Sequence, residues 1–263
     1  MANLKFEDLL DAGVHFGHLK RKWNPGMAPY IFDEKKGIHI IDLNKTIVKI
    51  DEAANALKQI AKSGRKILFV ATKKQAKDIL ESKVAETNMP FISERWPGGM
   101  LTNFKTTRKT IRKISSIDKM MKDGTADTMS KRERLQMTRQ REKMNKIFGC
   151  VVEMSRLPAA IFIVDIKKEH IALSEAKNLG IPVFAMVDTN SNPSDVDFVI
   201  PSNDDATKSI DLVLTAMCDA VKEGLGERRA SKEKADAAAQ KEKAAQQAKE
   251  EEAIAAESSE EKK

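Results

Sequence analysis

The chain has 263 residues, of which 41% are hydrophobic, 5% aromatic and 32% charged, and its formal net charge at pH 7 is +7. This length suffices for one sizeable α/β domain with an appendage. No apolar run approaches the ~18 residues that a membrane-spanning helix needs, and Met1–Leu10 lacks the continuous hydrophobic core of a secretory signal, so we expect a soluble, cytoplasmic protein.

The first feature in chain order is a basic loop, His18–Pro25 (HLKRKWNP), in which Lys20, Arg21 and Lys22 precede Trp23. A loop of this composition can place charge and a flat ring against a sugar-phosphate backbone. We include these four residues, together with Arg95, among the predicted RNA contacts. In the alternative interpretation, Trp23 plugs the edge of a sheet and the cations are merely solvated, since exposed tryptophan is uncommon.

Short apolar runs then alternate with segments of helical periodicity. Several runs are apolar at successive positions, as strands covered on both faces must be. The βαβ repetition predicts an α/β fold in which helices flank a parallel sheet formed by residues 1–100 and 150–225. The predicted strands are Gly37–Asp42, Lys66–Thr72, Pro90–Ser93, Ala159–Asp165, Pro182–Asp188 and Asp197–Pro201. The predicted helices are Asn44–Ser63, Lys73–Thr87, Lys168–Asn178 and Ala206–Glu223.

A basic segment interrupts this alternation between Ser93 and Pro158. From Lys105 to Lys146 it holds 14 Lys or Arg against 5 Asp or Glu, a net charge of +9, so the rest of the chain sums to −2. Ser130, with Glu133 three residues later, is typical of a helix-capping box. The pattern predicts an inserted helical hairpin over residues 101–149 with a thin coiled-coil seam. Apolar residues at helical spacing flank a break at Lys122–Thr128, and they are Ile111, Ile114, Ile117, Met121, Met137, Met144 and Phe148.

The excess of positive charge on this hairpin indicates a polyanionic partner. Stabilising helix pairs alternate acid with base at i,i+4, whereas an uncompensated basic face repels itself unless a partner neutralises it. Nucleic acid is the commonest large polyanion, and a merely solvated charged face is the alternative. The predicted contacts on the hairpin are Arg108, Lys109, Arg112, Lys113, Lys131, Arg132, Arg134, Arg139 and Arg141.

From Gly226 onward the composition changes abruptly to Lys, Glu, Ala, Gln and Ser. This tail, residues 226–263, carries 9 basic and 10 acidic residues, with Ile254 as its one large aliphatic side chain. Such a segment cannot bury a core. We expect a low-complexity tail that is either helical or disordered and that is not itself a nucleic-acid arm.

Motifs for catalysis or for nucleotide binding are missing from the sequence. The turn Ala71–Gln75 (ATKKQ) has no glycine that would let the backbone wrap a pyrophosphate, and no Gly-Lys-Ser/Thr motif occurs. The sequence also shows no recognisable Ser/His/Asp or Cys/His set of catalytic residues. The two cysteines, Cys150 and Cys218, lie far apart in apolar stretches, which predicts buried packing. We therefore predict no enzyme activity and no cofactor.

One candidate set for a divalent ion remains. His18 lies in a short turn, and Asp188 and Asp204 follow later predicted strands, at the sheet edge where ligands gather. Zinc or magnesium could be held by these side chains. The alternative, which the sequence favours, is a histidine that orients the backbone or meets a phosphate.

Seven segments, collinear from Leu4 to Gly224, match the pattern of one known family. They are Ala12–His18 (AGVHFGH), Trp23–Pro25 (WNP), Ile38–Thr46 (IHIIDLNKT), Leu68–Ala76, Trp96–Asn103 (WPGGMLTN), Gly180–Pro193 and Val196–Ala206. Together they resemble the bacterial small-subunit ribosomal protein S2 family. The chain departs from that pattern at Pro97, where leucine is usual, and at Ala71, where glycine is usual.

The resemblance implies a flavodoxin-like domain with an inserted hairpin, bound to small-subunit ribosomal RNA as a monomer within the ribosome. It also implies neighbouring small-subunit proteins as partners, among them ribosomal protein S1 in many bacteria. We predict a structural constituent of the small subunit that binds RNA phosphates and supports translation. One alternative is a nucleotide-binding enzyme with the hairpin as an RNA clamp. Another is a coiled-coil module for an acidic protein, which would need a wider apolar seam.

Overall fold

The body of the protein is built on a five-stranded parallel sheet. The structure, a computed structural model, describes residues 4–123, 129–152 and 154–260. The strand order is β5-β4-β6-β7-β8, and numbering these strands along the chain gives 2-1-3-4-5, the flavodoxin-like order. The predicted α/β fold is confirmed. The strands are β4 (Ile67–Val70), β5 (Phe91–Ile92), β6 (Ala160–Val164), β7 (Val183–Val187) and β8 (Phe198–Pro201).

The apolar strands bury both faces of this sheet. Every residue of β4, β6 and β7 is buried. Phe69, Phe162 and Phe184 pack in one apolar cluster with α2, α3 and α7, whereas Leu68 and Ile161 pack on the other face with α6 and the base of the hairpin. Successive side chains point to opposite faces of a strand, and each fully buried phenylalanine stabilises the fold by roughly 2–3 kcal/mol. The helices are α2 (Leu43–Lys62), α3 (Lys74–Ala85), α6 (His170–Asn178) and α7 (Thr207–Glu260).

A second, three-stranded antiparallel sheet lies near the amino end, after helix α1 (Phe6–Asp11). The prediction that Gly37–Asp42 belongs to the parallel sheet is wrong. Lys36 and Gly37 both have positive φ, 52° and 76°, in a two-residue turn between Lys35 and Ile38. Such a turn matches the twist of a β-hairpin and pairs this segment with the strand before it. In the order β1-β3-β2, the strands are β1 (Phe16–Leu19), β2 (Ile31–Lys35) and β3 (Ile38–Ile41).

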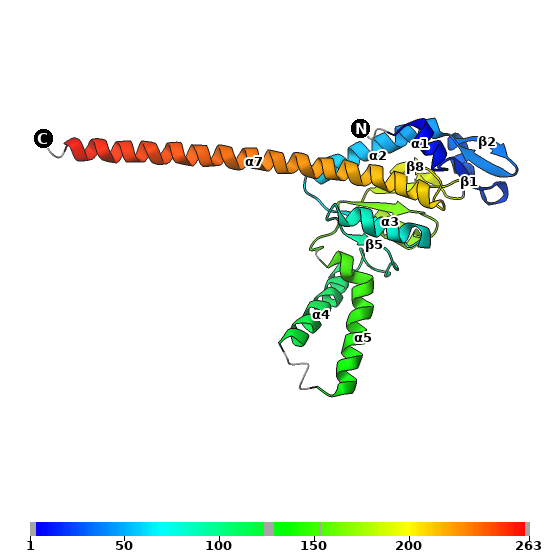
Figure 1. Ribbon diagram of the computed structural model, residues 1–263, viewed down its shortest axis with the longest axis horizontal. Helices are drawn as coiled ribbons and strands as arrows, with labels where there is room; N and C mark the ends of the chain where they lie inside the picture. Colours follow the sequence, from blue (N-terminus) through cyan, green and yellow to red (C-terminus); the bar gives the residue numbers. More distant parts are fainter. Residues whose placement is uncertain (1–3, 124–128, 153, 261–263) are drawn as a thin grey trace.

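The predicted hairpin is confirmed as α4 (Phe104–Lys122) and α5 (Lys131–Phe148), which project together from the body (Figure 1). The Ser130 side chain accepts from the Glu133 backbone, and the Glu133 side chain accepts from the Ser130 backbone, so the capping box is formed. The predicted break at Lys122–Thr128 lies mostly outside the described residues. Only α4 contributes buried side chains to the seam, and these are Ile111, Ile114 and Ile117.

Helix α7 begins where predicted but continues far beyond Glu223, to Glu260, and extends away from the body (Figure 1). Of the two states expected for the tail, the helical one is observed. Ion pairs join α7 to α2 where it leaves the body: Lys58 Nζ lies 3.0 Å from Glu223 and 2.9 Å from Glu227, and Lys62 Nζ lies 2.9 Å from Glu227.

The cysteines are divided between core and surface. Cys218 is buried on α7, as predicted, but Cys150 is exposed. In the short helix η4 (Gly149–Val151), Val151 takes the buried position and turns its neighbour Cys150 outward. Among the described residues, no helix has an apolar stretch long enough to cross a bilayer.

Two glycines of α7 provide a test of how closely this helix packs on α2. A Cβ on Gly224 would come within 2.4 Å of the Lys58 carbonyl oxygen, whereas a Cβ on Gly226 would meet nothing within 4 Å. We expect Gly224→Ala to lower the free energy of unfolding by about 1–3 kcal/mol through overpacking. Gly226→Ala should raise it by about 0.5–1 kcal/mol, because alanine favours helix.

Urea denaturation followed by circular dichroism would measure both changes. Similar effects of the two substitutions would contradict the close approach of α7 to α2 at Gly224.

Candidate functional site

The exposed cations of the hairpin form a basic surface on α4 and α5. Seven of the predicted RNA contacts have exposed side chains here, and they are Lys109, Arg112, Lys113, Lys131, Arg132, Arg134 and Arg139. The other two, Arg108 and Arg141, are half-buried. Arg108 Nη1 donates to the Ser155 carbonyl oxygen, and Arg141 pairs with Asp118 on the opposite helix. Arg141 therefore braces α5 against α4, and Arg108 braces α4 against the segment that follows the hairpin.

The second predicted basic surface directly follows β1. Lys20, Arg21 and Lys22 form the short helix η1 (Lys20–Lys22) with exposed side chains, and Lys20 Nζ lies 2.7 Å from Glu34. Trp23 is 37% exposed, and its ring centroid lies 5.2 Å from that of buried His39. The indole is therefore in contact with the protein and also open to solvent, and its contact with RNA stays a prediction.

The two basic surfaces lie on different parts of the molecule, because Figure 1 shows β1 at one end of the body and α4 and α5 projecting from below it. Arg95, also exposed, lies between β5 and the segment that leads to α4. The basic residues thus lie on surfaces that one extended polyanion would have to bridge.

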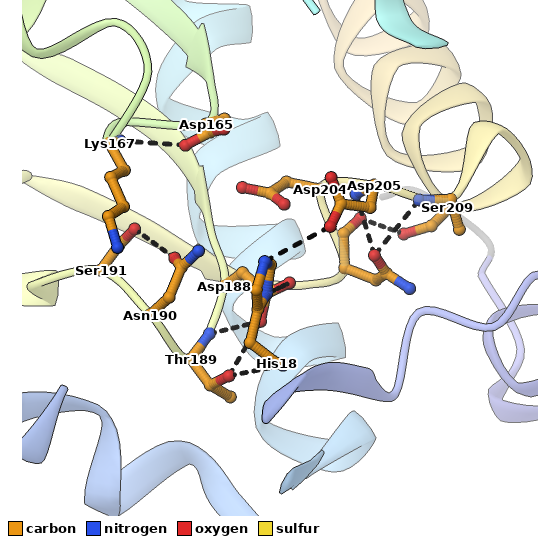
Figure 2. Close-up of polar contacts among 12 residues, drawn as sticks. His18, Asp165, Lys167, Asp188, Thr189, Asn190, Ser191, Asp204, Asp205 and Ser209 are labelled. Atoms are coloured by element: carbon orange, nitrogen blue, oxygen red, sulfur yellow. Dashed lines mark hydrogen bonds and ion pairs between the residues drawn. The ribbon is translucent and has the colours of Figure 1, made fainter. Parts of the chain in front are cut away.

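A group of charged side chains gathers at the carboxyl edge of the parallel sheet, and we call it the carboxyl-edge cluster; Figure 2 shows its histidine and its four aspartates. Strand ends bring its members together, because parallel strands all end at the same edge. Lys73 Nζ lies 2.8 Å from Asp165, 2.8 Å from Asp204 and 2.9 Å from Asp205. The members are Lys73 after β4, Asp165 after β6, Asp188 after β7, Asp204 and Asp205 after β8, and His18 from β1.

His18 connects the small antiparallel sheet to this cluster. Its Nδ1 lies 2.8 Å from Asp188 Oδ2, its Nε2 lies 3.4 Å from Asp205, and its backbone N–H donates to Thr189 Oγ1 at 2.8 Å. A Cβ on the preceding residue, Gly17, would lie 2.6 Å from the Thr189 side chain, so only glycine permits this approach. The structure therefore brings together the three candidate ligands for a divalent ion, although the sequence favoured a histidine without a metal: atoms of His18, Asp188 and Asp204 lie within 4.8 Å of one another.

Burial and crowding of negative charge shift the pKa values in the cluster. Burial, together with Asp165 and Asp188, raises the pKa of Asp204 to about 7, although Lys73 opposes the shift. Burial alone would lower the pKa of Lys73, but Asp204, Asp165 and Asp205 outweigh it and raise this pKa. The hydrogen bond to Asp188 raises the pKa of His18. Four carboxylates thus share one lysine and one histidine, and buried Asp204 Oδ2 has no hydrogen-bond partner among the described residues.

The crevice between β4 and β6, where a sheet of this strand order binds its ligand, is occupied by side chains of the protein. Buried Glu169 Oε1 accepts from the Thr72 backbone N–H at 3.2 Å and from the Thr72 hydroxyl. Lys168 Nζ donates to the Thr72 carbonyl oxygen at 2.8 Å. Burial raises the pKa of Glu169. Glu169 and Lys168 thus both bond to Thr72, in the turn after β4.

Sequence reasoning missed Lys73, Asp165 and Glu169 as members of this region. Each lies within a few residues of the end of a predicted strand, and a search for charged residues at such positions would have found them. Which of these residues pair depends on which strands are neighbours in the sheet, and hydrophobic periodicity does not predict that strand order.

The profile of the family described as Ribosomal protein S2 matches residues 9–224. The chain belongs to the ribosomal protein S2 family. The resemblance seen in the sequence is thereby confirmed, as is the prediction of a ribosomal protein that is not an enzyme. The match covers the hairpin and the carboxyl-edge cluster, and it ends where α7 leaves the body.

Curated relatives from several bacteria carry the name small ribosomal subunit protein uS2. The relative from Parabacteroides distasonis is 63% identical over 238 residues, which cover 90% of this chain and 86% of that protein. The relative from Phocaeicola vulgatus is 62% identical over 238 residues, covering 90% and 85%. The relative from Azobacteroides pseudotrichonymphae is 65% identical over 228 residues, covering 87% of each chain.

Lys73 and its exposed neighbour Lys74 allow the carboxyl-edge cluster to be tested. Lys73→Met would leave the carboxylates of Asp165 and Asp204 buried without their cation, and breaking a buried pair in this way costs about 3–5 kcal/mol. Lys74→Met removes the same charge from an exposed position. We expect a large loss of unfolding free energy in urea for the first variant and almost none for the second. Equal effects would contradict the role of Lys73 as the counter-ion of these buried carboxylates.

Proposed function

We propose that this chain is a structural constituent of the small ribosomal subunit that holds ribosomal RNA through the exposed cations of α4, α5 and η1. We place it in the cytoplasm, as a monomer within the ribosome. The single observation that carries the proposal is the net charge of +9 from Lys105 to Lys146, carried by a hairpin that projects from the body (Figure 1). The names of the curated relatives support the same assignment.

The proposed contacts are mainly to phosphates. Lys and Arg that neutralise phosphates release condensed counterions, which makes the affinity fall steeply as salt rises. A braced pair of helices reads the shape of RNA grooves and junctions, and aromatic stacking contributes little, because the chain has one Tyr and two Trp. The hairpin, residues 101–149, then acts as the RNA-binding unit on a scaffold formed by residues 1–100 and 150–225, with residues 226–263 as a charged tail.

Protein neighbours belong to this proposal as well. Outside Lys105–Lys146 the chain sums to −2, so the body apart from η1 offers RNA no excess of positive charge and is suited to contacts with proteins. Around the antiparallel sheet, Phe6, Phe16 and Phe32 are at least 46% exposed, and exposed apolar patches often mark protein contacts. We propose adjacent small-subunit proteins as partners, with ribosomal protein S1 as one candidate.

Neutralising the exposed hairpin cations tests the RNA-binding role. The variant Arg112→Gln, Lys113→Gln, Arg132→Gln, Arg139→Gln removes four exposed charges and leaves the bracing residues Arg108 and Arg141 in place. We expect weaker binding to small-subunit ribosomal RNA, and the slope of log affinity against log salt should fall by roughly one for each phosphate that the variant no longer neutralises. Filter binding across a salt series would measure both quantities.

A matched variant controls for net charge. Lys74→Gln, Lys208→Gln, Arg229→Gln, Lys232→Gln also removes four exposed cations, none of them on the hairpin. This variant should keep nearly the full salt slope. Unchanged binding by the hairpin variant, or an equal loss in both variants, would rule out the hairpin as the principal RNA contact.

We further propose that His18, Asp188 and Asp204 hold a divalent cation. The support is their ligand geometry together with the unpartnered, buried Oδ2 of Asp204. One imidazole nitrogen and two carboxylates suit Zn²⁺ better than Mg²⁺, which prefers oxygen ligands alone. A bound dication would offset the surplus of carboxylates over Lys73 and would tie β1 to the carboxyl edge of the parallel sheet. Its proposed role is structural.

Metal analysis and pH dependence test this site. We expect one zinc per chain in protein purified without chelators, and none in the His18→Ala, Asp204→Asn variant. The control His170→Ala changes an exposed histidine on α6 and should leave the metal content unchanged. A wild-type protein that contains no metal and whose thermal stability does not change on addition of ZnCl₂ would contradict the proposal.

The sign of the pH effect separates the metal-bound site from the metal-free one. In the metal-free protein the pKa of His18 is raised, so its pair with Asp188 stabilises fully below about pH 6.5, the unperturbed histidine value. That stabilisation is lost as pH rises through the folded pKa. Zinc requires deprotonated ligands, so its stabilisation increases as pH rises. In thermal melts between pH 5.5 and 8, the stabilisation contributed by this site should therefore increase with pH when zinc is present and decrease with pH when EDTA is present.

A further inference from the structure

A single buried carboxylate on α6 accepts five hydrogen bonds from the segment that leads into the hairpin. Glu175 is 6% exposed. Its Oε1 accepts from the Trp96 indole N–H at 3.0 Å and from the Gly99 backbone at 2.7 Å. Its Oε2 accepts from the backbone of Leu101 at 2.9 Å and of Thr102 at 3.1 Å, and from the Thr102 hydroxyl at 3.2 Å.

All five donors come from Trp96–Thr102, an irregular segment that ends just before α4 begins at Phe104. Gly99 has a φ of 83°, and its carbonyl oxygen accepts from the Asn103 backbone at 2.9 Å. Buried backbone N–H groups in such a segment need acceptors. Glu175 supplies them from a helix that is itself packed against the parallel sheet, so the segment is attached to the rigid part of the fold.

The carboxylate is suited to this work because it is ionised. Burial on its own raises the pKa of Glu175, but the hydrogen bonds from Trp96, Leu101, Thr102 and Gly99 outweigh burial and lower it. Near neutral pH both oxygens therefore act only as acceptors. A glutamine in the same place would offer one oxygen and turn an NH₂ group toward the remaining donors.

We infer that Glu175 is the positioning residue that sets the direction in which the basic hairpin leaves the sheet domain. This inference rests on the proposed function of the hairpin as an RNA contact. The apolar base, with Trp96, Leu101 and Ile111 in the cluster that also contains α6, seats the hairpin on the body. Apolar contact has no direction, whereas hydrogen bonds to one carboxylate define how the first turn of α4 is aimed.

Contacts on the other side of the hairpin base complete the attachment. Glu94 pairs with Lys77 of α3 and lies 3.5 Å from Lys146 of α5. These side chains are partly exposed, and exposed ion pairs contribute little and hold geometry loosely. Arg108 of α4 also donates to the Ser155 carbonyl oxygen, but that bond is exposed. Glu175 is therefore the buried tie that keeps α4 in a single orientation.

A fixed direction matters because the two basic surfaces lie on different parts of the molecule. If both contact the same RNA, binding by one raises the effective concentration of the other only when their relative position fits. If only a fraction of the molecules hold the hairpin in the orientation that lets both surfaces bind, the apparent affinity equals the intrinsic affinity multiplied by that fraction.

Distance measurements on the full-length protein test the inference. One spin label is attached at Ser116→Cys on α4 of the hairpin and the other at Gln59→Cys on α2 of the body, both exposed positions, in a Cys150→Ser background. The distance between the labels reports the orientation of the hairpin relative to the body. Wild type should show one narrow distance distribution, and Glu175→Gln a clearly broader one. The matched control is Glu169→Gln, because Glu169 is equally buried at the start of α6 but bonds to Thr72 of the sheet domain. It should keep the narrow distribution.

RNA binding provides the second readout. If the fraction of molecules with the correctly oriented hairpin falls to one-tenth, the affinity of Glu175→Gln for RNA should be about tenfold lower. The slope of log affinity against log salt should also be smaller, because fewer phosphates are neutralised at once. Glu169→Gln should bind like wild type. A narrow distribution in Glu175→Gln would overturn the inference, and so would a broad distribution with unchanged RNA affinity. The charge-neutralised hairpin variant tests the proposed function separately, because it alters no contact of Glu175.

Two further variants apply if Glu175→Gln does not fold. Trp96→Phe and Thr102→Val each remove one side-chain donor and leave the carboxylate in place. Each should broaden the distribution to a smaller extent than the loss of the carboxylate, and the double variant should broaden it more than either single one. Distributions as narrow as wild type in all three would count against Glu175 as the positioning residue.

Discussion

The covering of the parallel sheet on both faces is the constraint on which the rest of this structure depends. Strands β4, β6 and β7 are buried throughout, so helices must lie on each side and every crossover must return the chain to the same edge. Polar loops are thereby collected at the carboxyl ends of the strands. The hairpin enters through the loop after β5, the strand at one edge of the sheet, where an insertion leaves the packed layers undisturbed.

Charge is divided between these parts in a way that suits a scaffold. At the carboxyl edge, Lys73 lies within hydrogen-bond distance of three carboxylates, and Glu169 closes the crevice beside it. The place where this strand order admits a ligand is used for internal ion pairs. Positive charge is concentrated instead on a projecting element that no layer covers. The long helix α7 leaves the body in a third direction, held to α2 by Lys58 and Lys62.

The sequence patterns that succeeded share a physical origin. Five strands of the sheet, four helices and the hairpin were predicted because burial on two faces, helical periodicity and the capping box at Ser130 are local signals. The antiparallel sheet was not predicted as such. Strand β2 (IFDEK) has only Ile31 partly covered, so it lacks the apolar alternation that marks a strand, and its pairing with β3 depends on the turn at Lys36 and Gly37.

By itself, the amino-acid sequence determined the fold class, the position of the basic insertion and the family, because composition, periodicity and motifs are properties of the chain. Only the tertiary structure decided which charges meet. It paired Arg108 with Ser155 and Arg141 with Asp118, joined His18 to Asp188 across 170 residues of sequence, and gave Glu175 its donors from Trp96–Thr102. Such partners lie far apart along the chain, and only the order and twist of the packed strands bring them within hydrogen-bond distance.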